Sequence, residues 1–363
     1  METRANSNTR PLNPDMLLLA RESRGWSQTE AAERVGITQG RLSKMEAGLL
    51  PVPPDVLGSL ADILSYPEDF FRQGDAVYGP STTEFFHRKR QSAPIRVLDQ
   101  IHAWINIRRI HIDRLLRSTT STRKLQFEHV DLDEFQSPEE IARKARADWL
   151  LPKGPIKDLV RTIEAAGGIV VRFSFGTPKI DAVSTWVPGL PPLFFMNKDM
   201  PADRERLTLA HELGHILMHA TVRPDMETEA NRFAAEFLMP ELDIRPQLRD
   251  VNLARLAGLK PLWRVSMQAL LHRAQDLATI TQARAKSLWV QLSQKGYRKH
   301  EPPELAFPHE EVRALRQLLD LHLGSLGYSI ADLAQLLALH ENDVVGFYSL
   351  RSDSATRPRL TLA

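Results

Sequence analysis

The stretch Leu207-Thr208-Leu209-Ala210-His211-Glu212-Leu213-Gly214-His215-Ile216-Leu217-Met218-His219 decides the fold of the region around it. Its apolar residues recur at helical spacing and predict a buried amphipathic helix. Positions four apart share one face of a helix, about 6 Å apart along the axis, so His211 and His215 can bind one tetrahedral metal ion. Glu212 can then reach a water in the open coordination position. The alternative is a buried helix whose histidines are simply hydrogen-bonded polar groups.

A metal ion held by two histidines needs a third protein ligand, which must be His, Asp or Glu because the chain has no cysteine. His219 continues the ladder of histidines but lies about 12 Å along the axis from the first of them. A second helix is predicted over residues 225–240, with Glu227 and Asn231 on one face. We expect Glu227 to bind the metal and Asn231 to hydrogen-bond a ligand histidine; Glu229 is the alternative ligand.

Together, residues 211–219 and 227–240 resemble the ImmA/IrrE family of metallo-endopeptidases. The resemblance extends to Leu238-Met239-Pro240, which metal binding does not require. It implies a gluzincin-type site in which two histidines and one glutamate hold one zinc ion, and Glu212 is the catalytic base. It also implies hydrolysis of peptide bonds in proteins of the DNA-bound repressor type.

The N-terminal region predicts three short helices separated by glycine turns. A helix from Pro14 closes at Gly25, and Ser27 with Glu30 forms a capping box that opens the next. Gly36 makes the turn before a third helix, residues 39–47. Two short helices around such a turn are typical of a helix-turn-helix unit.

These residues resemble the XRE-type helix-turn-helix family, in which the third helix enters the major groove. The residues then expected at DNA are Gln28, Thr38, Gln39, Gly40, Arg41, Ser43 and Lys44. Gln28 can meet a phosphate, Gln39 suits adenine and Arg41 suits guanine. The alternative is a small helical module that binds protein and not DNA.

Composition describes an ordinary globular protein of two or three domains: 363 residues, 42% hydrophobic and 25% charged. The net charge of +2 gives no global attraction to nucleic acid, so any such site must be local. The absence of cysteine suits a reducing compartment. Because no apolar run approaches the roughly 20 residues that span a bilayer, and the N-terminus lacks the pattern of a signal peptide, we expect a cytoplasmic protein.

The predicted fold class is α+β and mainly α: an all-α helix-turn-helix module, a gluzincin-like core with a small three-stranded sheet, and a helical C-terminal region. The expected domains are residues 1–73, a linker and connector helix over 74–130, a peptidase domain over 131–260, and helices over 261–363. The predicted strands are residues 169–173, 182–187 and 192–197, and either of the last two can hold an extended substrate at a sheet edge.

Two further segments bear on DNA binding. Residues 85–117 are locally basic, and we favour a solvated connector helix over extra phosphate contacts. Residues 329–337 form a capped helix with some helix-turn-helix cadence, but a second DNA reader there is not favoured.

The leading hypothesis is a homodimeric, DNA-binding transcriptional regulator with a zinc endopeptidase domain, acting on a double-stranded operator. Its substrate would be a repressor-type protein, or the chain itself through the bare stretch 74–80. The alternatives are a regulator whose peptidase fold senses a metal or ligand without turnover, and an antitoxin-like or phage-type repressor whose C-terminal helices bind a partner. His219 and Arg232 are candidates for stabilising an oxyanion.

Overall fold

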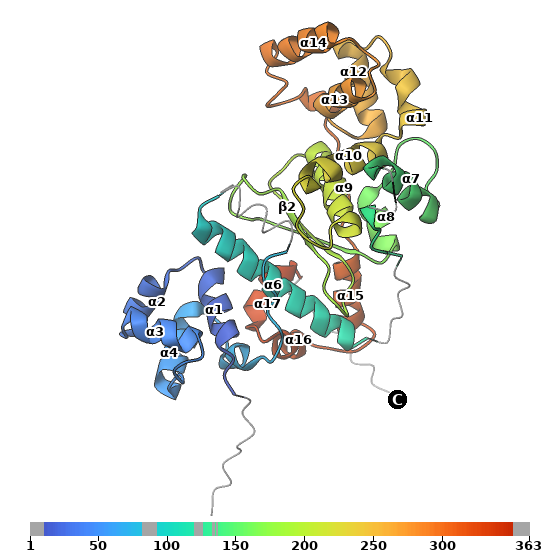
Figure 1. The fold of residues 1–363 in the computed structure, drawn as a ribbon. Coiled ribbons are helices and arrows are strands. Elements are labelled where there is room, and N and C mark those ends of the chain that lie inside the picture. Colours follow the sequence, from blue (N-terminus) through green and yellow to red (C-terminus); the bar gives the residue numbers. More distant parts are fainter. Residues whose placement is uncertain (1–10, 82–92, 120–125, 133–134, 136, 351–363) are drawn as a thin grey trace, which may run out of the picture. The chain divides into compact units, whose positions relative to one another are not determined.

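The computed structural model describes residues 11–81, 93–119, 126–132, 135 and 137–350 (Figure 1). By their contacts, these residues divide into two compact units. The first unit contains the described residues up to Tyr78, with 99–119 and 316–350; the second contains the rest. The C-terminal helices are therefore shared between the two units.

The first unit opens with five short elements. They are α1 (Pro14–Ser23), α2 (Gln28–Val35), α3 (Gln39–Glu46), α4 (Pro54–Leu64) and the 3-10 turn η1 (Glu68–Arg72). The predicted capping box of Ser27 and Glu30 opens α2, which ends at Gly36 in a left-handed conformation. The aromatic residues after α4 fill the base of this bundle, where Tyr66 and Phe70 stack with ring centroids 4.1 Å apart. Helices α2 and α3 thus have the predicted helix-turn-helix form.

The rest of the first unit is helical too. It contains most of α6 (Ile95–Arg117) and α15 (Ala314–Leu323), with α16 (Ile330–Leu337) and α17 (Glu341–Tyr348). Buried isoleucines line one side of α6, among them Ile101, Ile105 and Ile110, as expected for a connector helix. The N-terminal part of the predicted basic segment, residues 85–90, lies outside the described residues.

Within the expected bare linker at residues 74–80, residues 75–78 are bonded to α6, so this part of the linker is not bare. Asn106 of α6 bonds both the N–H and the carbonyl oxygen of Tyr78. Arg109 donates to the carbonyl oxygen of Ala76, and Arg114 pairs with Asp75. The physical reason is that α6 turns long polar side chains toward this segment and satisfies its backbone.

The second unit is built on a three-stranded mixed sheet, as predicted. Its strands are β1 (Ile169–Phe173), β2 (Ala182–Thr185) and β3 (Leu193–Asn197), in the order β1-β3-β2. β3 runs parallel to β1 and antiparallel to β2, with Val171 and Val183 both opposite Phe195. All five residues of β3 are buried, so β3 is the centre of the sheet and β2 is an edge strand.

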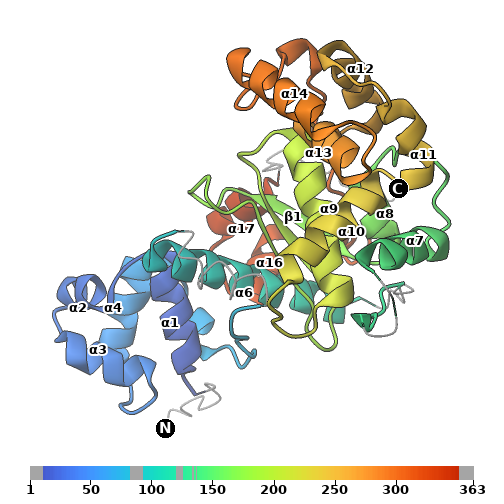
Figure 2. The ribbon, with the colours of Figure 1, turned by 45° about the horizontal axis from the view of Figure 1, so that its top comes forward.

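Helices cover this sheet and form the rest of the unit (Figure 2). They are α7 (Pro138–Asp148), α8 (Leu159–Ala165), α9 (Ala202–Met218), α10 (Met226–Leu238), α11 (Glu241–Ile244), η3 (Arg245–Leu248), α12 (Leu253–Trp263), α13 (Met267–Asp276), α14 (Gln282–Gln294) and η4 (Pro303–Leu305). Helix α8 starts after the N-cap Asp158, whose side chain accepts from the N–H of Arg161. One buried core joins the sheet to α9, α10, α12 and α13 and includes Phe194, Phe233 and Trp263.

The predicted fold class is confirmed: the described chain is mainly helical with one small sheet. Among the described residues, no helix is both long and apolar enough to cross a bilayer.

Candidate metal centre and DNA-reading face

Helices α9 and α10 lie side by side at unusually short range, because α9 has a glycine where they meet. A Cβ on Gly214 would lie 3.1 Å from Cδ1 of Phe233 and 3.3 Å from Cα of Ala230. Both of those distances are tighter than ordinary van der Waals contact, so Gly214 permits the approach. This packing brings the histidines of α9 within reach of the carboxylate of Glu227 on α10.

The structure brings His211, His215 and Glu227 together at one point, as predicted. Nε2 of His211 and Nε2 of His215 are 2.9 Å apart. The carboxylate of Glu227 lies 3.6 Å from the first of these nitrogens and 3.3 Å from the second. Ligands about 2.1 Å from a tetrahedral ion are separated by about 3.4 Å, so this spacing fits a single metal ion.

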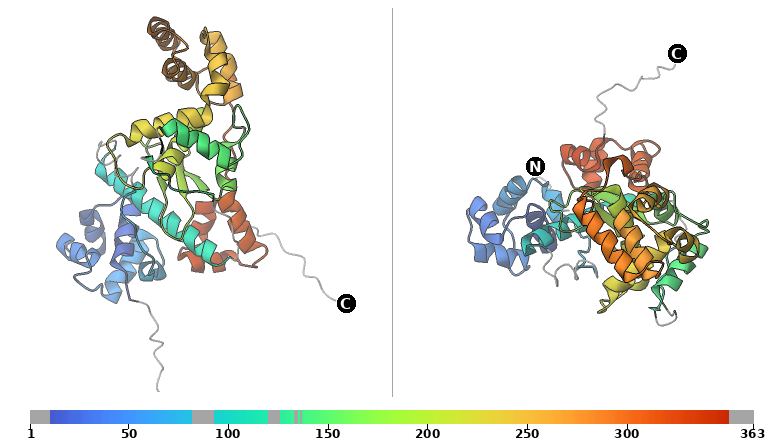
Figure 3. Two further views of the ribbon diagram at one scale, coloured as in Figure 1. Left: turned by 45° about the vertical axis from the view of Figure 1, so that its right-hand side comes forward. Right: turned by 90° about the horizontal axis from the view of Figure 1, so that it is seen from above.

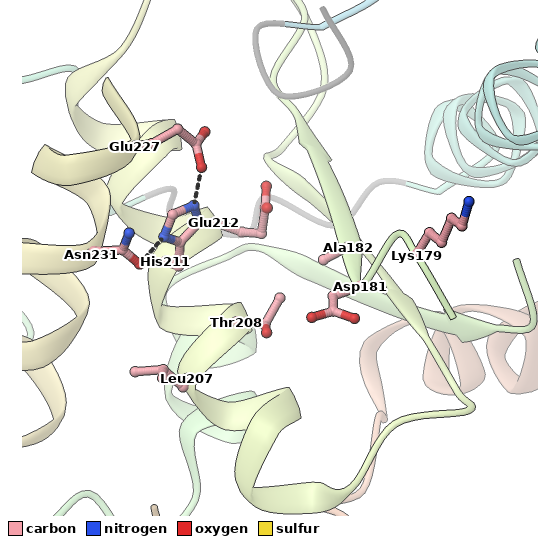
Figure 4. A pocket seen from close by; sticks show the side chains of 9 residues that line it. All are labelled: Lys179, Asp181, Ala182, Leu207, Thr208, His211, Glu212, Glu227 and Asn231. Carbon is pink, nitrogen blue, oxygen red and sulfur yellow. Dashed lines mark hydrogen bonds and ion pairs between the residues drawn. The ribbon is translucent and has the colours of Figure 1, made fainter. Parts of the chain in front are cut away.

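Hydrogen bonds at the Nδ1 atoms of His211 and His215 fix the tautomers of the two imidazoles. Nδ1 of His211 lies 3.0 Å from Oδ1 of Asn231, the partner predicted for it (Figure 4). Nδ1 of His215 lies 2.9 Å from Nδ1 of His219, whose Nε2 lies 2.9 Å from a carboxylate oxygen of Glu229. The oxygen of Asn231 can only accept, so Nδ1 of His211 carries a proton. The carboxylate of Glu229 also accepts, so Nε2 of His219 donates to it and Nδ1 of His219 accepts a hydrogen bond from Nδ1 of His215.

With these tautomers, both Nε2 atoms present lone pairs to the same point. Two lone pairs 2.9 Å apart cannot hydrogen-bond each other, so the arrangement calls for a cation between them. Oε1 of Glu227 is buried and makes no hydrogen bond, and it faces the same point. These three residues are also the one group of three or more metal-binding side chains in the described part of the chain. They fit a metal ion.

The pKa shifts of the three residues differ in direction, and those of His211 and Glu227 favour a positive charge at their common point. Burial lowers the pKa of His215 to about 4, so its imidazole is neutral at neutral pH. Burial also opposes protonation of His211, but the nearby carboxylates of Glu227 and Glu212 outweigh it and raise the pKa of His211. For Glu227, burial favours the neutral acid, yet the contacts with both imidazoles hold its pKa well below the usual range.

Glu212 lies beside this group and lines the same cavity (Figure 4). Only 3% of Glu212 is exposed, and its Oε2 accepts a hydrogen bond of 2.5 Å from the hydroxyl of Ser184 on β2. Sequence reasoning missed Ser184, because nothing in the motif around Glu212 points to a strand residue 28 positions earlier.

The cavity has a volume of about 230 Å³ and opens between α9, α10 and the edge strand. Its lining residues are Lys179, Asp181, Ala182, Leu207, Thr208, His211, Glu212, Glu227 and Asn231. Asp181 is already paired with Arg204 at 2.7 Å. Two strands were predicted as possible edge strands for the substrate. The prediction is wrong for β3, which is hydrogen-bonded to a strand on both sides, whereas β2 is at the edge and borders the cavity.

Two alternatives raised by the sequence are engaged elsewhere. Glu229 is not in the ligand group and bonds His219. Neither His219, enclosed between His215 and Glu229, nor Arg232, in a bidentate pair with Glu139, is placed as an oxyanion donor. The sequence signal for His219 was present in its spacing, but its role as a link behind the ligands was missed.

The outer surface of α2 and α3, where the sequence predicts DNA contacts, is supported from beneath by a buried ion pair. Arg21 of α1 donates to both carboxylate oxygens of Glu46, at 2.6 and 3.0 Å. Oε2 of Glu46 accepts from the amide of Gln28, and the carbonyl oxygen of that amide accepts from Gln39, at 2.8 and 2.7 Å. The chain of bonds fixes two glutamines on the outer surface of α2 and α3.

The other expected DNA residues line the same helix. Thr38 caps α3 by accepting from the N–H of Arg41 at 3.3 Å. The remaining positions, at the start and on the outer face of α3, are Gly40, Arg41, Ser43 and Lys44, of which only Ser43 is partly buried. Arg34, which the sequence analysis did not select, is also exposed and lies over the ring of Trp26 at 4.1 Å.

Both the helix-turn-helix region and the region around the candidate metal site match known protein families. Residues 17–71 match the helix-turn-helix family, and residues 164–275 match the IrrE N-terminal-like domain of peptidase family M78. The chain therefore contains an XRE-type helix-turn-helix DNA-binding domain and an IrrE N-terminal-like domain. A search of curated proteins found no match.

Proposed function

We propose that this protein is a DNA-binding transcriptional regulator that is also a zinc-dependent endopeptidase. The observation that carries the peptidase half is the convergence of His211, His215 and Glu227 beside Glu212. The tautomers set by Asn231 and His219 support it, because they leave both ligand nitrogens unprotonated. The alternative of a sensor without turnover leaves Glu212 at the cavity unexplained.

His211, His215 and Glu227 would hold the zinc ion, a donor set of two imidazoles and one carboxylate that suits a catalytic zinc site. When bound, zinc acidifies a water and polarises a carbonyl group. Glu212 takes a proton from water and returns it to the leaving amine. Ser184 donates to Oε2 of Glu212 and so orients the carboxylate beside the cavity.

The substrate lies as an extended strand along β2. This edge strand has a strand partner on one side only within the described residues, and Ala182 of β2 borders the cavity. We propose that the substrate is a separate repressor-type protein and not the chain's own linker, because residues 75–78 are bonded to α6. The helix-turn-helix domain directs the protein to an operator as a homodimer.

The test incubates purified, zinc-loaded protein with candidate repressors and follows cleavage by mass spectrometry. Glu212→Gln keeps the zinc ion, and its cleavage rate falls about 10²–10⁴-fold because the general base is lost. The matched control is Asp276→Asn, an exposed carboxylate of the same unit, which leaves the rate unchanged. Full proteolysis by Glu212→Gln would reject the assigned base. Zinc binding without cleavage of any protein would favour a regulator that senses a metal or ligand without turnover. Release of the N-terminal domain would instead show that the protein cleaves its own chain.

A further inference from the structure

The C-terminal helices of the first unit repeat the helix-turn-helix domain in a constant register. Shifting the numbering by 302 places α2 on α16 and α3 on α17, each helix keeping its eight-residue length. The same shift places Gly25 on Gly327, and both glycines have positive φ, 66° and 71°. Helix α15 precedes α16 as α1 precedes α2.

The capping chemistry repeats with the helices. Ser27 and Glu30 form a capping box at the start of α2, and Ser329 with Asp332 forms another at the start of α16. Each box contains the same three bonds, including backbone-to-carboxylate bonds of 2.7 and 2.8 Å. Such reciprocal capping fixes where a helix begins.

The turn between the paired helices repeats as well. Gly36 ends α2 at φ 73°, and Ala338 ends α16 in the same left-handed region at φ 52°. The next residue then bonds back to the same carbonyl position in both copies: Ile37 to Ala32 and Leu339 to Ala334, each at 3.0 Å. An alanine rarely adopts this conformation, so its presence shows that the turn geometry is imposed by the fold.

The outer faces of the two copies differ in charge. Where α3 carries Gln39, Arg41 and Lys44, α17 carries Glu341, Asp343 and Gly346. Residues 329–350 contain no lysine or arginine. Carboxylates at the start of a recognition helix repel phosphates, and without cations there is no release of counterions to drive binding. This copy is therefore unsuited to DNA.

The inner face of the second copy is bonded to α6. Tyr348, which the shift of 302 pairs with Glu46, has its hydroxyl 2.7 Å from Nδ1 of the buried His111. Phe347 lies under the guanidinium of Arg108 at 4.8 Å. All three helices of the copy take part, since Arg114 donates to the carbonyl oxygen of Leu336 in α16 and Ser118 lies 2.7 Å from Nε2 of His322 in α15. The ribbons show α6 running beside the C-terminal helices (Figures 1 and 3).

Helix α6 is bonded to the DNA-binding domain at the same time. Gln100 and Trp104 both donate to the carbonyl oxygen of Ser23, at the end of α1. Ser23 in turn is bonded to the hydroxyl of Tyr66 at 2.9 Å. One helix thus links the first copy to the second within a single compact unit.

We propose that residues 314–350 are a second helix-turn-helix domain, which binds the protein's own helix α6 in place of DNA. By holding α6 it braces the DNA-binding domain at the end of α1. This role does not depend on the peptidase activity, so either proposal can fail without the other.

Two variants of the full-length protein test the two halves of this proposal. Tyr348→Phe removes the bond to His111 and leaves a buried nitrogen without its partner. Its unfolding midpoint falls by several degrees, as for an unsatisfied buried polar atom, while its zinc content is unchanged. The matched control, Tyr297→Phe in the second unit, does not lower the midpoint of the first unit. An unchanged unfolding midpoint in Tyr348→Phe would contradict the proposal that the C-terminal helices brace the first unit through α6.

Glu341→Gln with Asp343→Asn tests the absence of DNA contact. If α17 stays away from DNA, removing two negative charges leaves the affinity for random duplex DNA in low salt the same within twofold. A gain of tenfold or more, measured by fluorescence anisotropy, would place α17 at the phosphates and overturn the proposal. Arg41→Ala in the first copy serves as the positive control and weakens binding.

Discussion

At the proposed metal centre, three side chains from two helices turn their ligand atoms to one point. On the expected DNA-reading face, seven residues lie on one turn and two helices, and each would meet a different part of the duplex. The first arrangement is partly buried, and we expect it to fail as a whole when one ligand is lost. The second is exposed and loses affinity in steps. The contrast shows which of the two sites tolerates gradual change.

The largest expected effect is the loss of a single ligand from the metal centre. His215→Ala removes one imidazole and also unlinks His219, so the bound metal falls from one ion to none. Metal analysis after dialysis measures this, with exposed Thr228→Ala on α10 as the control. Adding Glu227→Gln to His215→Ala changes nothing further. A full complement of metal in His215→Ala would mean that the ligands do not act as one set.

Acid pH is expected to destabilise the first unit through its buried His111. Burial lowers the pKa of His111 to about 3, below its unfolded value of about 6.5. The unfolded chain therefore binds a proton that the folded chain refuses between pH 6.5 and 3, so stability falls as the pH falls through this window. The expected loss is about 4 kcal/mol from pH 7 to pH 3. In urea titrations at several pH values, His111→Gln flattens this dependence; an unchanged slope would contradict the assignment.

Changes on the DNA-reading face have intermediate effects. Arg41→Ala and Lys44→Ala each remove one exposed cation, at a cost of about 1–3 kcal/mol of binding free energy for a base contact and less for a phosphate contact. Because the two side chains act separately, the double variant shows the sum of the two effects, within about 0.5 kcal/mol. Anisotropy titrations across a range of salt concentrations measure the loss of binding free energy and the change in its salt dependence, which separates a base contact from a phosphate contact. A double variant no weaker than the worse single variant would show that this face is as cooperative as the metal centre.

The smallest effect concerns the turn of the first helix-turn-helix. Gly36→Ala adds a Cβ that meets nothing within 4 Å, so the cost is only that of a left-handed alanine at φ 73°, about 1 kcal/mol. Ala338→Gly in the second copy relieves the same strain and gains up to about the same amount. Thermal unfolding of both variants checks the pair, and equal signs of the two shifts would contradict the equivalence of the turns.

Local patterns allowed much of this molecule to be predicted from its sequence. Spacings of four residues placed His211 and His215 on one face and Glu227 and Asn231 on another, and a capping box located α2. These features depend on helix geometry alone. The predicted pairing of Glu227 with the two histidines needed one further step, the packing of neighbouring helices.

Contacts between distant residues were out of reach. Ser184 meets Glu212 only because β2 packs beside α9, and strand alternation gives no sign of it. His111 and Tyr348 are 237 residues apart, and no local pattern connects them. The linker was misjudged for the same reason: its residues lack periodicity, and their hydrogen-bond partners come from α6.

If the substrate binds along β2 as proposed, the edge position of this strand has a consequence for the protein that is cut. A segment can join β2 only after it has given up its own internal hydrogen bonds, because the strand offers backbone groups to an extended chain alone. The local folding equilibrium of the target then sets its lifetime. A ligand that stabilises the folded target would slow its cleavage, and a ligand that unfolds a single loop would speed it, with no change in the peptidase itself.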